Sequence, residues 1–115
     1  MAYDEDLANR VRELLAGELT TGETADEKRM FGGLAFLVGG HMAVAVSGAG
    51  GLMVRVDPAQ TEQLLREPHA FPMVMRGREM DGWLRVAADG STDGGVLAPW
   101  VRRGVAYVRT LPAKG

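Results

Sequence analysis

The side chains that could carry out chemistry in this sequence are few and widely spaced. There is no cysteine, which excludes a thiolate nucleophile, a disulfide and an iron–sulfur cluster. His41 and His69 are the two groups that titrate near neutrality, and a metal site would have to combine them with carboxylates from distant loops. Ser47 and Ser91 lack the Gly-x-Ser-x-Gly elbow of a serine hydrolase. We therefore predict no catalytic residue, no metal site and no cofactor.

Two glycine clusters deserve comparison with phosphate-binding loops. The segment Gly48-Ala49-Gly50-Gly51 leads into a predicted strand, whereas a phosphate loop leaves a strand and opens a helix. A turn between two strands explains the glycines of this segment. The motif Met30-Phe31-Gly32-Gly33 is different, because a glycine pair beside a strand indicates a bulge or a close backbone approach rather than a simple hairpin turn. We assign both clusters a structural role.

The charge balance argues against nucleic-acid binding. The 115 residues carry 13 Lys+Arg against 15 Asp+Glu, a net charge of −2. Domains that bind nucleic acid through phosphate contacts are usually strongly basic. Arginines do recur on the predicted last two strands and last helix, at Arg76, Arg78, Arg85, Arg102, Arg103 and Arg109. We interpret them as solvated side chains and do not expect direct DNA binding.

Hydrophobic periodicity divides the chain into helices at both ends and strands between them. A period of 3.6 predicts helices from Tyr3 to about Gly17 and from about Asp93 or Val96 to Leu111. Asp57-Pro58 is a helix-start signal for a short helix that continues to about Glu67. Alternation predicts strands at 34–38, 42–46 and 52–56 in a meander, and at 73–78 and 83–88 around a connection at 79–82. Residues 18–28 are expected to form a loop, with the alternative of a helical turn at 25–29.

This order, α-β-β-β-α-β-β-α, predicts an α+β fold with two layers and an antiparallel sheet of about five strands. We expect a single domain over residues 1–115. The acidic N-terminus and the short apolar runs predict no signal peptide and no membrane span, so we expect a cytoplasmic location.

The two faces of the predicted sheet differ in side-chain size. Bulky residues should face the helices, and they are Leu34, Phe36, Val38, Met42, Val44, Val46, Leu52, Val54 and Val56. The other face is small and apolar in the middle, with aromatic and cationic groups around it: Ala35, Ala43, Ala45, Met53, Arg55, Trp83 and Arg85, together with Leu37 and Ser47. A solvent-facing surface would carry Lys, Glu and Thr. Either a helix or the loop 18–28 covers this face, or it binds a protein partner or a second copy of the chain. The methionines on the strands either fill gaps in the core or contribute to an adaptable binding surface.

Several of these segments together resemble the TfoX/Sxy N-terminal domain family. The resemblance is carried by residues 28–36 (KRMFGGLAF), 40–43 (GHMA), 52–56 (LMVRV), 77–83 (GREMDGW) and the Trp100-Val101 pair, and Met30, Phe31, Gly32 and Gly33 are its most specific part. It implies an α+β domain similar to secretion-chaperone-like architectures. Full-length members act in bacterial regulation of competence for DNA uptake, alongside the cyclic-AMP receptor protein, and carry a second domain, so this chain resembles the stand-alone form. The resemblance brings no catalytic residues.

Three hypotheses for function follow. The first is a non-enzymatic domain that works through protein association, in regulation of the transcriptional or competence type. The second is a small-ligand-binding or enzymatic domain, whose pocket lies between the sheet and the loop 18–28 with His41, Arg55 and Arg85 as its polar groups. The third is weak nucleic-acid binding.

Overall fold

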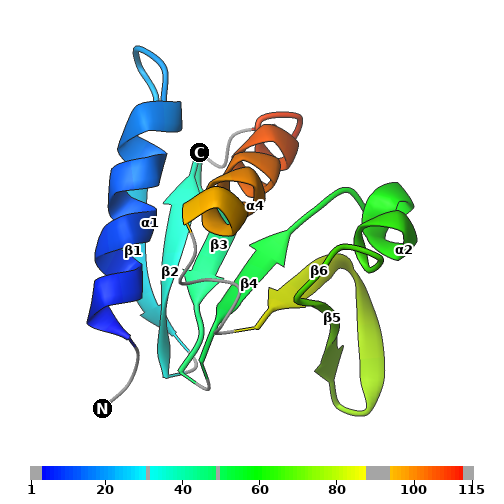
Figure 1. The fold of residues 1–115 in the computed structure, drawn as a ribbon. Helices are drawn as coiled ribbons and strands as arrows, with labels where there is room; N and C mark the ends of the chain where they lie inside the picture. Colours follow the sequence, from blue (N-terminus) through cyan, green and yellow to red (C-terminus); the bar gives the residue numbers. More distant parts are fainter. Residues whose placement is uncertain (1–3, 31, 49, 88–93, 113–115) are drawn as a thin grey trace.

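The computed structural model describes residues 4–30, 32–48, 50–87 and 94–112 (Figure 1). Its helices are α1 (Glu5–Glu18), a short 3-10 helix (Pro58–Gln60), α2 (Thr61–Leu64) and α4 (Gly94–Val108). Its strands are β1 (Ala25–Met30), β2 (Gly33–Val38), β3 (His41–Val46), β4 (Leu52–Arg55), β5 (Ala70–Met75) and β6 (Arg78–Val86). None of the described helices is long and apolar enough to cross a membrane.

The strands form one antiparallel sheet in the order β1-β2-β3-β4-β6-β5. Helices α1 and α4 pack side by side on the same face of it, and the β5–β6 hairpin projects away from them (Figure 1). The predicted α+β class with helices at both ends is therefore confirmed, although the sheet has six strands rather than about five.

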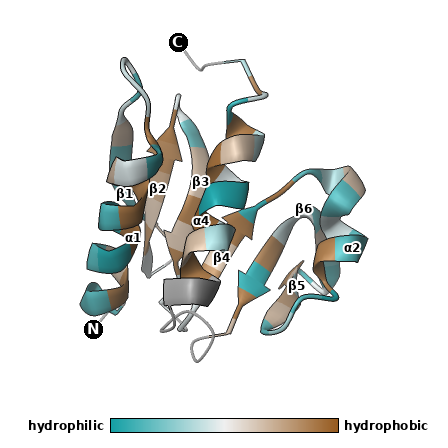
Figure 2. Cartoon of the chain, turned by 45° about the horizontal axis from the view of Figure 1, so that its top comes forward, coloured by the Kyte–Doolittle hydropathy of each residue, from teal (hydrophilic) through white to brown (hydrophobic). Residues whose placement is uncertain are grey.

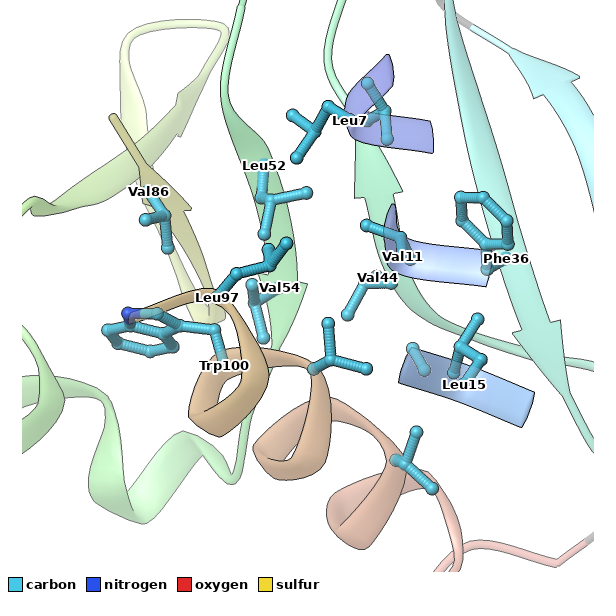
Figure 3. Packing of buried hydrophobic residues seen from close by; sticks show 14 of the residues in the cluster. Leu7, Val11, Leu15, Phe36, Val44, Leu52, Val54, Val86, Leu97 and Trp100 are labelled. Atoms are coloured by element: carbon cyan, nitrogen blue, oxygen red, sulfur yellow. The ribbon is translucent and has the colours of Figure 1, made fainter. Parts of the chain in front are cut away.

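The core fills the space between the sheet and these two helices. Apolar colouring follows β2 and β3 behind the helices (Figure 2). Leu7, Val11 and Leu15 of α1 point at β2 and β3, and Trp100 of α4 reaches the side of Val86 (Figure 3). Asp4 starts α1 as its cap, because its side chain accepts a hydrogen bond from the Leu7 N–H at 3.2 Å. The spacing of four residues between the buried leucines and valine puts them on one side of the helix.

The additional strand is β1, in a segment for which we predicted a loop or a helical turn. It pairs with β2 from Ala25 opposite Val38 to Met30 opposite Gly33. As an outer strand it carries four consecutive charged residues, so it shows no alternation of apolar and polar side chains. Pairing with β2, rather than burial of its own side chains, makes it a strand.

The Met30–Gly33 motif closes this β1–β2 hairpin, so our prediction that it is not a hairpin turn is wrong. The predicted close backbone approach is confirmed, because a Cβ on Gly33 would lie 2.2 Å from the Val46 carbonyl oxygen. Gly32 has φ +74°, a conformation that favours glycine. Phe31 lies outside the described residues.

A β-bulge in β3 changes which residues face the helices. The pairing of β2 with β3 shifts between Phe36 and Leu37, so that Val44 lies opposite Phe36, Met42 lies opposite Leu37, and Ala43 is the extra residue. Ala43 is fully buried in the core beneath the helices. Our assignment of Ala43 to the outer face and of Met42 to the helix face is therefore wrong for both residues, because one extra residue reverses the alternation.

The second half of the chain follows the predicted order with different boundaries. Asp57 caps the 3-10 helix, as predicted, by accepting from the Ala59 N–H at 2.9 Å. The turn between β5 and β6 lies at Arg76 and Gly77, which have φ of 55° and 77°. The predicted connection at 79–82 is instead part of β6. Asp93, the earlier of the two predicted starts of the last helix, lies outside the described residues.

Candidate interaction face

The face of the sheet opposite α1 and α4, called here the far face, carries most of the predicted site. Residues directly opposite each other in an antiparallel pair share a face. The register therefore defines a row across all six strands in the order Lys28, Ala35, Ala45, Met53, Arg85, Phe71. A second, shorter row runs from Asp26 to Leu37 and Met42. Neighbouring positions on the same strands, such as Leu34, Val44 and Leu84, belong to the core on the other face.

Small residues at the middle of the far face are surrounded by long apolar ones. Ala35 and Ala45 lie opposite each other, and they are only 1% and 2% exposed although they are outside the core cluster under the helices. Four flexible apolar side chains around them are half-buried: Met30, Leu37, Met42 and Met53. The accessible part of this surface is thus formed by methionine and leucine rather than by alanine. Phe71, which is 53% exposed, continues it at the outer strand.

One row of the far face holds four of the seven predicted face residues, Ala35, Ala45, Met53 and Arg85, and two more, Arg55 and Trp83, lie two residues along β4 and β6 on the same face. Arg55 and Trp83 pair at the end of β4, where the Arg55 guanidinium lies 5.5 Å from the Trp83 ring and 5.7 Å from that of Tyr107 on α4. These two residues therefore form an aromatic and cationic cluster at the end of the sheet. Ala43 is on the other face.

Sequence reasoning missed three residues of the far face, and for different reasons. Lys28 belongs to a strand without alternation, and Met42 was displaced by the bulge. Phe71 precedes the point at which we expected the strand to begin, and the signal that could have included it is the uncharged run from Ala70 to Met75.

The cations of the two faces differ in their partners. On the helix side, four arginines are each bound to a glutamate, in the pairs Arg12–Glu27, Arg102–Glu18, Arg103–Glu67 and Arg109–Glu23. On the far face, Arg85 contacts the Ser47 hydroxyl at 3.5 Å, and neither it nor Lys28 has an ion pair with a carboxylate among the described residues. These four arginines are each paired with a glutamate, so they do not form a basic stripe for nucleic acid.

Both edges of the sheet resist the addition of another strand. On β5 the His69 carbonyl accepts from the Ala87 N–H at 2.8 Å, so the backbone groups of Ala70 and Pro72 point outward. Pro72 has no N–H, and the Ala70 N–H donates to the Glu67 carbonyl at 3.2 Å. On β1 the edge is protected by its run of charged side chains. Of the two faces, the helix side is covered by α1 and α4, and the far face is not.

A separate hollow lies where our second hypothesis placed a pocket. It measures about 640 Å³ and is lined by Thr20, Gly22, Glu23, Thr24, Val38, Gly39, His41, Val108, Arg109 and Leu111. His41 is present, with its Nε2 2.6 Å from the Pro112 carbonyl oxygen, whereas Arg55 and Arg85 are elsewhere. A bidentate pair between Glu23 and Arg109, at 2.8 and 3.0 Å, ties the loop to α4 at this hollow. Hydrogen bonds from Arg109 and Thr20 lower the pKa of Glu23 to about 2.

No cluster of three or more potential metal ligands occurs within the described ranges. The TfoX N-terminal domain family matches residues 17–107. No curated protein and no solved structure gives a significant match. With the helix-flanked antiparallel sheet and the Met30–Gly33 motif both in place, this match over most of the sequence means that the chain belongs to the TfoX N-terminal domain family.

Proposed function

We propose that this chain is a non-catalytic domain that binds a protein partner through the far face, in a regulatory role of the transcriptional or competence type. The observation that carries the proposal is the far face itself, which is apolar and has neither α1 nor α4 packed against it. Uncovered apolar patches with a polar rim mark interaction sites. The family is not a known enzyme family.

The dimensions of the far face suit a protein interface. Six strands about 4.8 Å apart and about six residues long at about 3.3 Å per residue cover roughly 600 Å². A stable interface of standard size buries about 800 Å² of accessible surface on each partner. That figure includes the roughness of the surface and a rim, which the flat estimate leaves out. One partner on this face therefore accounts for most of a standard interface.

The proposal is tested by a substitution in the middle of the face. Met53→Glu places a charge among the half-buried apolar side chains and leaves the core untouched, and Ala16→Glu places the same charge on the exposed side of α1. Tagged wild type and both variants are cross-linked in the native cell, and the captured proteins are quantified by mass spectrometry. We expect Ala16→Glu to retain the wild-type partners and Met53→Glu to lose them. If folded Met53→Glu retains them all, the far face is not the binding surface.

The hollow beside His41 supports a second candidate, a site for a small ligand. Its volume of about 640 Å³ falls in the usual range for such sites, about 300–1,000 Å³. Its apolar residues Val38, Val108 and Leu111 adjoin the polar groups of Glu23, Arg109 and His41. A fragment screen followed by NMR should place bound fragments next to Val38 and Val108 if the site is used, and their absence at high fragment concentration would remove this candidate.

A further inference from the structure

We infer that the partner element received by the far face is an amphipathic α-helix with an apolar stripe and acidic residues on both sides of it. This inference rests on the proposed function and adds the chemistry of the partner. It follows from three features of the structure: the protected sheet edges, the apolar surface, and the two cations on either side of that surface, Lys28 and Arg85, which form no ion pair with a carboxylate among the described residues.

The edges of the sheet oppose strand addition, which is the commonest way in which a sheet binds an extended peptide. Strand addition needs a row of free backbone donors and acceptors. On β5, Pro72 and the occupied N–H of Ala70 interrupt that row, and on β1 the charged run protects it. A partner must therefore bind through side chains, and an apolar helix face on an apolar surface is the recurring solution of that kind.

The positions of the cations set the width and charge of the partner. Lys28 on β1 and Arg85 on β6 are four strand spacings apart in the same row, which is about 19 Å. A helix with its side chains is about 10–12 Å across, so one that lies along the strands leaves about 4 Å on each side, a distance suited to ion pairs. Glutamates on its two flanks can then reach Lys28 and Arg85. The register also places Asp26 on this face, two residues from Lys28 on the same strand, so the glutamate that pairs with Lys28 has to lie on the side of it away from Asp26.

The same cations disfavour a second copy of the chain as the occupant. A two-fold axis along the strands would place β6 of one copy over β2 of the other, with its Arg85 next to Lys28. A two-fold axis across the strands would place Arg85 over Arg85. Either arrangement brings like charges together at the rim of an apolar contact, which costs affinity.

The apolar surface suits a helix because its side chains can rearrange. Met30, Met42 and Met53 are unbranched and half-buried, and they lie around the closely packed Ala35 and Ala45. Methionine surfaces adapt to the irregular apolar ridge of a bound helix. The bulge contributes directly, since it places Met42 on this face.

The test uses the full chain and synthetic helical peptides of about 16 residues with leucines at i, i+3, i+4 and i+7. One peptide carries Glu on both flanks, and a matched peptide carries Lys there. Binding is followed by amide chemical shifts in isotope-labelled protein. We expect the Glu peptide to shift the amides of Ala45 and Met53 and to bind with a Kd of about 10–500 µM, and the Lys peptide to bind at least about tenfold more weakly.

Variants at the two cations locate the interaction. Lys28→Glu and Arg85→Glu should each weaken the Glu peptide about tenfold, whereas Arg29→Glu, on the same strand as Lys28 but on the helix side, should change its Kd by less than about twofold. Any one of three results overturns the inference. The far-face amides do not shift at about 1 mM Glu peptide, the Lys peptide binds as tightly as the Glu peptide, or Arg29→Glu weakens binding as much as Lys28→Glu and Arg85→Glu do. A dimer seen by light scattering that Met53→Glu dissociates also overturns it, while leaving association through the far face intact.

Discussion

Replacing one glycine by alanine in each of the two long helices should change the unfolding free energy in opposite directions. Gly104 of α4 sits directly above the bulge in β3, and a Cβ there would lie 2.6 Å from the Ala43 carbonyl oxygen and 3.0 Å from a Val44 methyl group. Gly17 of α1 has no heavy atom within 4 Å of the same added carbon and has no left-handed φ. We predict that Gly104→Ala destabilises the fold and that Gly17→Ala stabilises it.

The magnitudes follow from two opposing effects. Alanine in place of glycine inside a helix gains up to about 1 kcal/mol, which acts at both positions and is smaller at Gly17 because this residue is next to the end of α1. At Gly104 the clash is with backbone, so α4 must move away from β3, and such overpacking costs about 1–3 kcal/mol or more. The expected net change in unfolding free energy is about −1 to −2 kcal/mol for Gly104→Ala and about +0.5 kcal/mol for Gly17→Ala.

Guanidinium unfolding measures both changes. Trp100 is 2% exposed on α4 and provides a fluorescence signal for the helix that must move, while circular dichroism follows the whole fold. A net loss of about 1–2 kcal/mol corresponds to a fall of several degrees in Tm. If Gly104→Ala is as stable as the wild type or more stable, the close packing of α4 on the bulge is not a constraint and our reasoning about this contact is wrong.

Three further changes test other contacts. Gly33→Ala should destabilise more than Gly104→Ala, because its Cβ would lie 2.2 Å from the Val46 carbonyl oxygen; equal thermal stability would contradict the geometry. Glu23→Gln should reduce the dependence of the unfolding free energy on pH at acid pH. The pKa of Glu23 in the fold is about 2, below its ordinary value of 4.5. Its ion pair therefore stabilises the fold above about pH 4.5, and this contribution is lost as the pH falls towards 2. Urea unfolding between pH 2 and 7 measures this, and identical profiles would show that the pair with Arg109 does not stabilise the fold. Thr61→Val removes the oxygen that accepts from the Gly82 N–H at 2.9 Å in a buried position, and should cost about 1–3 kcal/mol in the same unfolding assay; no loss would mean that the N–H finds another acceptor.

The sequence predicts the elements that bury their own side chains and misses those that depend on a neighbour. Helices α1 and α4 and strands β2 to β4 carry apolar residues at a period that burial imposes, so their presence can be predicted from one chain. Strand β1 is held by its pairing with β2, and its charged residues show no period. The turn at Arg76 was missed because arginine is an unusual residue for a left-handed conformation.

The candidate site was predictable to the same extent. Alternation assigned Ala35, Ala45 and Met53 to one face, and the structure places them there together with Arg85. Alternation cannot anticipate an extra residue, and so it failed for Met42 and Ala43. The hollow beside His41 was placed correctly between loop and sheet, but the arginine that lines it, Arg109, comes from the far end of the chain.

The bulge at Ala43 links the two faces of the sheet. On the helix side it directs the Ala43 carbonyl towards α4, and only a residue without a Cβ at position 104 allows the helix to approach so closely. On the far side the same extra residue turns Met42 outward to lie beside Leu37, and so it completes the methionine surface around Ala35 and Ala45. A regular β3 would present Ala43 to the far face and bury Met42 under α4, where the close packing leaves no room for it. One residue therefore sets both the approach of α4 and the composition of the proposed binding surface, and we expect changes at Gly104 that move the helix to alter binding at that proposed surface.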